Sequence, residues 1–301
     1  MVKELQKTVY ADLLLDTAFK RSFKEYGDAK RLMLLFLQAL IPERKIASIE
    51  YTPEESTNQN PDRKSIRVDV ECVDENGQRF VVEVQRAKQE DFFDRAVFNS
   101  SFSIQRQLRE GVKSFRLAPV YFIGITRFDL HQDPDQFLYH YQLTERRTQK
   151  VMTDNLHYIF LEVSKCKNND SSPFVEKIGF ALNNMGSFEK RPDGFAGEFF
   201  DLLFNSADIA NFAPEDKIKY LNDMTTERDI HNQIEYARKE GIEKGIEKGI
   251  EKGIEKGREE GREEGREEER SSIAAKLKAQ GFPIDAIAEA TGLPIEQLEA
   301  L

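Results

Sequence analysis

Cysteine is scarce in this 301-residue sequence: Cys72 and Cys166 are the only two, and they lie far apart along the chain. No CxxC pair and no cluster of cysteine with histidine occurs, so a structural zinc site is not expected. The sequence also lacks the cysteine density of a disulfide scaffold, which fits a reducing compartment. We therefore expect a cytoplasmic protein that binds no zinc.

Long hydrophobic runs are missing as well. The longest, residues 32–37, is far too short to cross a bilayer. The charged start MVKELQK is not followed by the apolar stretch of a signal peptide. We expect no membrane association, although 39% hydrophobic residues supply enough apolar material for a folded core.

A surplus of positive charge, which nucleic-acid-binding proteins commonly show, is also absent. The chain has 44 Lys and Arg against 54 Asp and Glu, a formal net charge of −10. The acidic surplus lies beyond residue 127, however, because the first 127 residues carry a slight excess of basic side chains. The composition therefore does not exclude DNA as a partner of the N-terminal half.

The apolar pattern predicts an α/β core followed by a helical second half. Asp28 is expected to cap the second helix, and Pro42 to end it. The predicted helices are residues 16–26, 28–40, 91–109, 173–183, 196–204 and 215–223. The predicted strands are residues 45–51, 66–72, 80–85, 117–126, 137–143 and 157–163.

Two of these strands, residues 66–72 and 80–85, form a predicted hairpin whose register decides where its carboxylates lie. A two-residue Asn76-Gly77 loop would put Asp69 and Glu83 on opposite faces. A three-residue loop, residues 75–77, uses Gly77 as a left-handed bulge residue and places Asp69 directly opposite Glu83. This register also brings the apolar residues onto one core face, so we predict it. That apolar set is Ile66, Val68, Val70, Phe80, Val82 and Val84.

In the predicted register the Cβ atoms of Asp69 and Glu83 are about 4.5–5.5 Å apart. Two opposed carboxylates repel each other unless a cation lies between them. Mg²⁺ is the cation that such a pair of carboxylates is expected to bind. Bound Mg²⁺ polarises a phosphoryl oxygen and lowers the pKa of its water, as phosphodiester hydrolysis requires. Gln85 shares that face and can hydrogen-bond a water or a phosphate.

Other catalytic signatures are lacking. The four histidines show no HxH or HExxH spacing, and no GxSxG nucleophile elbow supports a serine triad. Five cationic side chains near the hairpin are candidates for DNA phosphate contacts. These are Lys20, Arg67, Arg86, Lys88 and Arg95.

The segment 239–270 is an internal repeat in which glycine recurs every four residues from Gly241 to Gly265, joined by isoleucine in its first half. The collagen period is three, so this is not collagen. On a helix the glycine column drifts about 40° per repeat, and each glycine costs about 1 kcal/mol. The pattern is compatible with a solvated helix, a flexible spacer or a stripe for pairing between helices.

The last 31 residues, 271–301, are apolar again and have the spacing of a small helix-turn-helix-like module, with Gly292 in the turn. The start of its second helix offers acidic residues rather than the Arg, Lys or Asn that read DNA bases. A helical cap or an oligomerisation module fits this composition better than a DNA reader.

Four segments together resemble the PD-(D/E)XK nuclease family transposases, also called recombination-promoting nucleases. The matching segments are Asp16-Thr-Ala-Phe19-Lys20, Arg67-Val-Asp69-Val, Asn76-Gly77 and Phe80-Val-Val-Glu83-Val-Gln85. The glycine-rich tail is similar in style. The resemblance implies a restriction-endonuclease-like core, a central mixed sheet flanked by helices, within residues 1–238, with a helical extension from about residue 173.

The resemblance also implies roles for individual residues. Asp69, Glu83 and the backbone carbonyl of Val84 would hold Mg²⁺, for which Mn²⁺ can substitute. The wider fold has a lysine where this chain has Gln85, whereas the narrower family commonly has glutamine. Asp16 either lies at the rim of the site or caps its own helix.

The function expected from these features is metal-dependent DNA endonuclease activity of the transposase or recombination-promoting type. The alternative is a catalytically weak or inactive module that binds DNA or protein and self-associates into a homo-oligomer through its C-terminal repeat.

Overall fold

The computed structural model describes residues 8–53, 68–108 and 116–300, apart from some side chains between residues 227 and 237. It contains two compact units, residues 1–226 and 227–301, and each is described by itself. The expected domain boundary at residue 238 stays a prediction. Arg67 and Ile66 lie outside the described residues.

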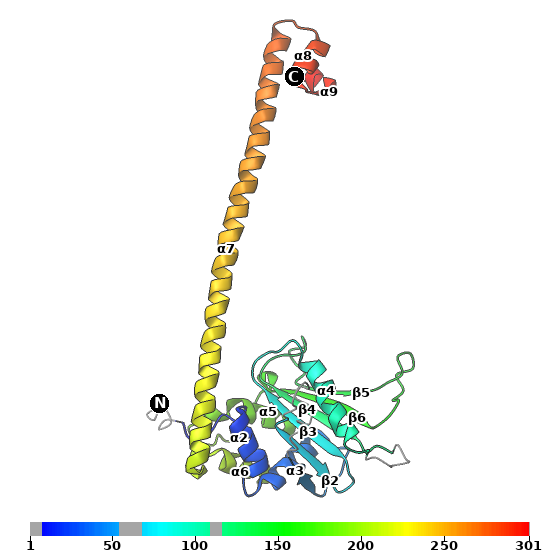
Figure 1. Cartoon of the computed structure of the whole chain (residues 1–301), viewed down its shortest axis with the longest axis vertical. Coiled ribbons are helices and arrows are strands. Elements are labelled where there is room, and N and C mark those ends of the chain that lie inside the picture. The colour runs from blue at the N-terminus through cyan, green and yellow to red at the C-terminus, as the bar shows by residue number, and fades with distance from the viewer. Residues whose placement is uncertain (1–7, 54–67, 109–115, 301) are drawn as a thin grey trace. The chain divides into compact units, whose positions relative to one another are not determined.

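The first unit is built on a mixed six-stranded sheet with the order β1-β2-β3-β4-β6-β5 (Figure 1). Strands β3, β4 and β6 are parallel, whereas β1, β2 and β5 each run antiparallel to a neighbour. The strands are β1 Ile49–Tyr51, β2 Val70–Asp74, β3 Arg79–Gln85, β4 Val120–Thr126, β5 Leu138–Gln142 and β6 Leu156–Glu162. The expected central mixed sheet with flanking helices is confirmed.

The hairpin between β2 and β3 has the predicted register. Val70 pairs with Val82, and the Asp74 N–H donates to the Gln78 carbonyl at 3.0 Å, which closes a three-residue loop. Gly77 has φ of +80°, the left-handed conformation that this loop requires. Strand β2 begins only at Val70, however, so the expected strand is shorter at its start.

Helices on one face of the sheet enclose the larger core. They are α2 Asp16–Lys20, α3 Ala29–Leu40, α5 Phe174–Asn184 and α6 Glu198–Ala207. The first expected helix changes at Arg21 into a π-helical turn, η1 Arg21–Glu25. Asp28 occupies the N-cap position of α3, but its side chain makes no capping hydrogen bond. Val70, Val82 and residues of these helices share the core.

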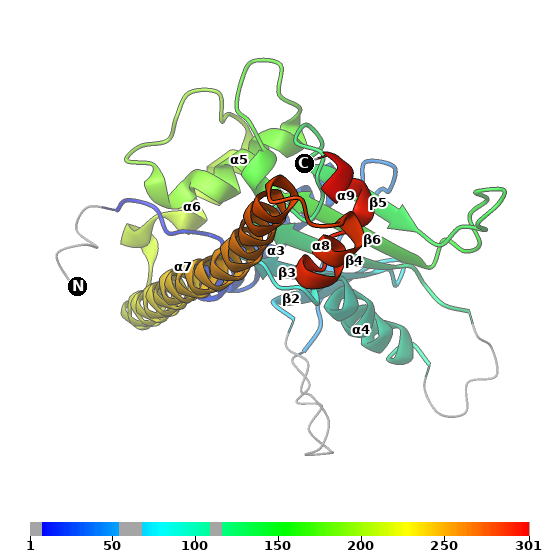
Figure 2. The ribbon, with the colours of Figure 1, turned by 90° about the horizontal axis from the view of Figure 1, so that it is seen from above.

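Helix α4 Phe92–Gln105 packs on the other face, as Figure 2 shows by the positions of α4 and α5. Its inward face carries buried Phe92 and Ala96, followed by buried Asn99 and Ser103. Phe93 and Val97 lie beside this face and are 43% and 57% exposed. The polar part of the inward face meets buried carboxylates of the sheet.

Short 3₁₀ turns connect the remaining elements, and α7 then begins. The turns are η2 Val163–Lys165, η3 Met185–Ser187 and η4 Ile209–Asn211. Helix α7 Pro214–Ala279 continues through the whole glycine repeat, so the repeat is helical here. A Cβ atom added to any of the repeat glycines would meet nothing within 4 Å.

The C-terminal module contains the end of α7 with α8 Ile284–Thr291 and α9 Ile295–Ala300. Gly292, with φ of +68°, ends α8 in the left-handed conformation of a helix C-cap. The module has its own small core of Ala274, Ile287, Leu293 and Leu298. None of the helices in the part of the chain that the structure describes is long and apolar enough to span a membrane.

Candidate active site

Glu83 is a buried carboxylate near the carboxyl end of β3, where the sheet faces α4. Its side chain is almost inaccessible, and Asn99 Nδ2 of α4 donates to its Oε2 at 2.8 Å. Its Oε1 forms an ion pair and hydrogen bond with the Arg95 guanidinium. Burial raises the pKa of Glu83, and the positive charge of Arg95 opposes that rise. Glu83 is thus held by α4 from two directions.

Gly124 on β4 allows α4 to approach the sheet beside Glu83. It pairs with Glu83 across the β3–β4 ladder. A Cβ atom at this position would lie 2.9 Å from the Phe160 ring and 3.0 Å from the Phe92 ring. Because these rings fill the space that a side chain would need, the first two turns of α4 can bring Arg95 and Asn99 to the carboxylate.

Asp69 lies immediately before β2 and is held by different elements. Its Oδ2 accepts a hydrogen bond from the backbone N–H of Val84 at 2.6 Å, and its Oδ1 is 4.0 Å from Lys20 Nζ of α2. Burial and a hydrogen bond with Asp16 raise the pKa of Asp69 well above its usual range, although the Val84 N–H and Lys20 act in the opposite direction.

The expectation that Asp69 and Glu83 face each other across the hairpin therefore needs correction. The register brings the two residues to adjacent positions, because Val70 pairs with Val82. Asp69 lies in a bend outside the ladder, however, and its side chain turns to the Val84 N–H. Val68 packs with the smaller cluster under α4 instead of with the Val70 core, since the chain changes direction at this bend.

Asp16 lies at the rim of this site rather than at a helix cap. It is the first residue of α2, whose N-cap position is Leu15. Its carboxylate pairs with Lys20 at 2.9 Å, one helical turn later, and hydrogen-bonds Asp69. Of the two alternatives for Asp16, the structure thus favours the position beside Asp69.

Gln85 lies two residues beyond Glu83 and is directed toward α4. Its Oε1 accepts a hydrogen bond from Arg95 at 3.2 Å, and its Nε2 donates to the Ala87 carbonyl at 3.2 Å. Arg95 therefore links Glu83 with Gln85, two of the three side chains that the sequence predicts for the centre of the site.

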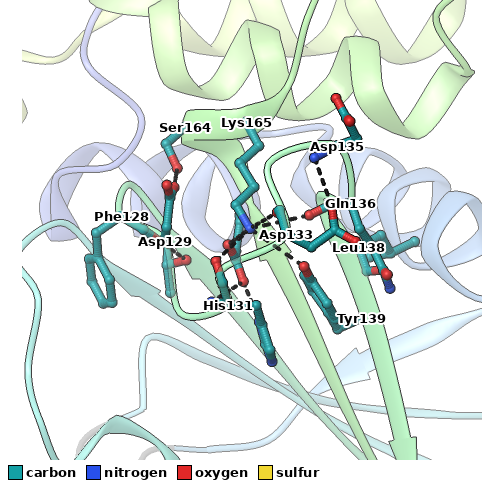
Figure 3. A network of polar contacts seen from close by, with 12 residues as sticks. Phe128, Asp129, His131, Asp133, Asp135, Gln136, Leu138, Tyr139, Ser164 and Lys165 are labelled. Atoms are coloured by element: carbon teal, nitrogen blue, oxygen red, sulfur yellow. Dashed lines mark hydrogen bonds and ion pairs between the residues drawn. The ribbon is translucent and has the colours of Figure 1, made fainter.

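A second polar network holds the loop after β4 at the same edge of the sheet (Figure 3). Lys165 Nζ is 2.7 Å from the fully buried Glu162 carboxylate and donates to the carbonyls of His131 and Asp133 at 2.9 and 2.5 Å. The His131 ring stacks on Tyr139 with 3.6 Å between ring centroids. These contacts fix the conformation of the β4–β5 connection at the carboxyl ends of the parallel strands.

The sequence matches the model of one known protein family. The model for the PD-(D/E)XK nuclease family transposases matches residues 13–237. The chain belongs to this family. No curated protein and no solved structure shows significant similarity to it. The match covers the whole sheet and both helical layers of this PD-(D/E)XK chain, so the resemblance of the four short segments is confirmed.

The predicted phosphate-binding cations of this PD-(D/E)XK chain have different surroundings. Arg95 and Lys20 contact the carboxylates described above, whereas Arg86 pairs with Asp12 at 3.4 Å. Lys88 is exposed in the segment between β3 and α4. Arg67 lies outside the described residues.

The residues at the predicted metal position offer oxygen donors, the type that Mg²⁺ and Mn²⁺ prefer. Within the described residues, no group of three or more His, Cys, Asp or Glu side chains is gathered as a metal site. Glu83 is nevertheless buried, the Asp69 side chain is only 15% exposed, and Arg95 and Lys20 compensate their negative charges. A hard divalent cation fits this donor set, provided that it takes over that compensation.

Sequence reasoning missed two residues that contact members of the candidate site. Asn99 donates to Glu83, which is the first of them. The second is Asp12, whose carboxylate accepts bidentate hydrogen bonds from Arg127 at 2.8 and 2.9 Å and also pairs with Arg86. A signal for the first was present, because Asn99 and Ser103 continue the helical spacing of Phe92 and Ala96, which are buried on the same face of α4. Asp12 carried no comparable local pattern.

Proposed function

We propose that this protein is a metal-dependent DNA endonuclease of the recombination-promoting type, which hydrolyses phosphodiester bonds. One observation carries the proposal: in a PD-(D/E)XK chain, the buried carboxylate of Glu83 and the mostly buried carboxylate of Asp69, which accepts the Val84 N–H, lie at one end of β3 beside Gln85. Burying a carboxylate costs free energy unless it is compensated. Two such groups at one point of the sheet are typical of a functional site.

The metal ligands in this proposal are Asp69, Glu83 and the backbone carbonyl of Val84. Mg²⁺, or Mn²⁺ in its place, would supply electrophilic polarisation of the phosphoryl group and a more acidic water. A bound cation would favour the ionised form of Asp69, against the burial and the Asp16 hydrogen bond that raise its pKa. The Val84 N–H keeps Oδ2 of Asp69 in place.

Gln85 and the surrounding cations act on the substrate. The Gln85 amide both donates and accepts, so it can orient a water or a phosphate oxygen although it carries no charge. Phosphate binding is assigned to the five cations Lys20, Arg67, Arg86, Lys88 and Arg95. Each phosphate contact that is lost should lower the slope of log binding constant against log salt by about 1.

The experiment that tests this proposal is nicking of supercoiled plasmid DNA with Mg²⁺ or Mn²⁺. We expect Asp69→Asn and Glu83→Gln to lower the rate by at least ~10²-fold, because each removes a charged ligand. The matched control is Glu71→Gln. Glu71 is a buried carboxylate two residues beyond Asp69, and it is bound at the C-terminal end of α4 by Ser103 and by the C-cap residue Arg106.

Glu71→Gln should keep its specific activity even if it unfolds at a lower temperature. The endonuclease proposal fails if the wild-type protein nicks no DNA with either metal. It fails equally if Glu83→Gln nicks as fast as the wild type.

A second candidate function, self-association through α7, is favoured by one observation. Four isoleucines of the repeat are 53–66% exposed, and they recur every four residues. The four are Ile242, Ile246, Ile250 and Ile254. Rows of this spacing are the ridges through which helices pack at steep crossing angles, about −50°.

The mass in solution tests this candidate. If α7 assembles copies of the chain, replacing all four isoleucines by glutamine should lower the mass measured by light scattering, and removal of residues 241–301 should do the same. Equal masses for the wild type and both variants would eliminate the tail as an assembly device.

A further inference from the structure

Two arginines of α4 neutralise two buried glutamates of the sheet. Arg95 pairs with Glu83 near the beginning of the helix, and Arg106, its C-cap residue, pairs with Glu71 at 2.7 Å. Each glutamate also accepts a hydrogen bond from a neutral side chain of α4, Asn99 in one case and Ser103 in the other. The two pairs therefore resemble each other, except that Glu71 also has a second arginine, Arg79, at 3.5 Å.

The pairs also differ in what else the arginine touches. Arg95 also donates to Gln85 at 3.2 Å and hydrogen-bonds Gln89, so its guanidinium bridges β3 and the segment after it. Glu83 and Gln85 are the β3 side chains that the proposed function assigns to metal and water. The positive charge of Arg95 thus lies beside Glu83, at the position where the positive charge of a metal ion would lie.

A carboxylate as buried as Glu83 needs a compensating charge in every state of the protein. Two cations close to the same carboxylate repel each other, so a divalent ion and the Arg95 guanidinium cannot both sit at Oε1 with full contact. The Arg95 side chain is 31% exposed, and its long stem can swing to solvent. Asn99, by contrast, is buried and can stay on Oε2 because it is neutral.

We propose that Arg95 is an internal stand-in for the metal: it neutralises Glu83 in the metal-free protein, and a divalent cation displaces it toward the DNA phosphate. Arg95 thereby competes with metal for Glu83 and becomes a phosphate contact once released. The inference rests on the proposed function, since it takes Glu83 to be a metal ligand.

The test measures metal binding alone, by titration calorimetry with Mn²⁺ on the full chain, with no DNA present. A displaced charge-assisted hydrogen bond corresponds to roughly 10- to 100-fold in a binding constant. We therefore expect Arg95→Met to bind Mn²⁺ at least about tenfold more tightly than the wild type. Arg95→Lys, which keeps the charge, should stay close to the wild type.

Arg106→Met is the matched control, because it removes the shorter of the two ion pairs of Glu71, a glutamate that the proposed function does not use. It should lower the melting temperature without changing the affinity for Mn²⁺. Arg95→Met should also melt at a lower temperature, but Mn²⁺ should restore more of its stability than it does for the wild type.

A readout on the wild-type protein covers the case in which Arg95→Met does not fold. Phenylglyoxal, a reagent for arginine, should modify Arg95 faster when Mg²⁺ is present, with Arg106 unchanged, as measured by mass spectrometry of peptides. Equal modification of Arg95 with and without Mg²⁺ would contradict displacement.

The outcomes separate this inference from the endonuclease proposal. Metal-dependent nicking that Glu83→Gln abolishes, together with unchanged or weaker Mn²⁺ binding by Arg95→Met, overturns the inference alone. Tighter Mn²⁺ binding by Arg95→Met without any nicking supports the inference and removes the endonuclease function. Failure of both the wild type and Arg95→Met to bind Mn²⁺ overturns both.

Discussion

The backbone N–H of Thr17 donates a hydrogen bond to the carboxylate of Asp223, with 3.1 Å between nitrogen and oxygen. Thr17 is the second residue of α2, so Asp223 satisfies one of the amide groups that a helix start leaves without an intrahelical partner. The Thr17 hydroxyl donates to the same carboxylate. A residue of α7, 206 positions away, therefore caps the helix that carries Asp16 and Lys20.

The first prediction concerns this long-range cap. Asp223→Ala should lower the free energy of unfolding by about 1 kcal/mol, the usual loss on removing an N-terminal cap. The midpoint of thermal unfolding, followed by circular dichroism, should fall by about 2–4 °C. Asn222→Ala is the control, since Asn222 is exposed on the same turn of α7. A smaller loss for Asp223→Ala than for the control would contradict the capping role.

The second prediction concerns the pH dependence of Asp69. Burial and the hydrogen bond with Asp16 raise the pKa of Asp69 in the folded protein. A carboxyl whose folded pKa lies above its unfolded value near 3.9 stabilises the fold at low pH, and this contribution is lost as pH rises through the folded pKa. Asp69→Asn removes the titration and can still accept the Val84 N–H. In the absence of metal it should therefore melt increasingly above the wild type as pH rises from about 4.

Glu75 supplies a control of opposite sign for this pH series. Its pKa is lowered because backbone N–H groups, its own first and then those of Ser48 and Ala47, donate to its carboxylate. A lowered pKa stabilises the fold above the unfolded value, so Glu75→Gln should lose stability at neutral pH and little at pH 3. Parallel curves of melting temperature against pH for Asp69→Asn and the wild type would show that burial does not raise the pKa of Asp69.

Metal should reverse this effect. Added Mn²⁺ at neutral pH should raise the melting temperature of the wild type but not that of Asp69→Asn.

The third prediction concerns the close approach at Gly124. A methyl group there would lie about 3 Å from the rings of Phe92 and Phe160, so those rings must move. Overpacking of this kind costs about 1–3 kcal/mol. We expect Gly124→Ala to lower the urea midpoint accordingly. Gly27→Ala, where a Cβ atom meets nothing within 4 Å, should leave it nearly unchanged. Equal midpoints for the two variants would argue against tight packing of α4 at this point.

The fourth prediction concerns the helical repeat. Gly245, Gly249 and Gly253 lie in open surroundings within α7, so replacing each by alanine adds helix propensity without a clash. Each change should stabilise the local helix by about 1 kcal/mol. The helical signal in circular dichroism, and its persistence on heating, should both increase.

Gly281→Ala is the opposing control for the repeat. Gly281 follows α7 with φ of +83°, a conformation that alanine adopts only with strain, so this variant should lose helical signal at the C-terminal end. If the triple alanine variant shows no gain in helicity, the glycines do not weaken α7.

Much of the fold was predictable because it depends on local patterns. The alternation of apolar residues and the turn chemistry at Gly77 determine the β2–β3 register, since a slip of one residue would expose the core face. The helical spacing of apolar residues likewise predicts α3 and α5, because it places those residues on one face of each helix. The nearness of Asp69 to the end of β3 follows from that register, although Asp69 itself lies in a bend outside the ladder. The sequence alone therefore determined which residues could form the site.

The sequence did not determine what those residues contact. Apolar Phe93 and Val97 of α4 are exposed to a large extent, whereas polar Asn99 and Ser103 are buried, because they bind the buried carboxylates Glu83 and Glu71. A helix packs according to the surface beneath it, and that surface is assembled from strands distant in sequence.

The same reason explains the charges around the two central carboxylates. Arg95 on Glu83, Asp16 on Asp69 and Asp223 on Thr17 are contacts between separate elements, and no spacing rule within one element predicts them. Local pattern determined the strands, the hairpin and the candidate ligands. Only the tertiary structure decided the counter-ion of each carboxylate, because compensation of a buried charge depends on which element covers it.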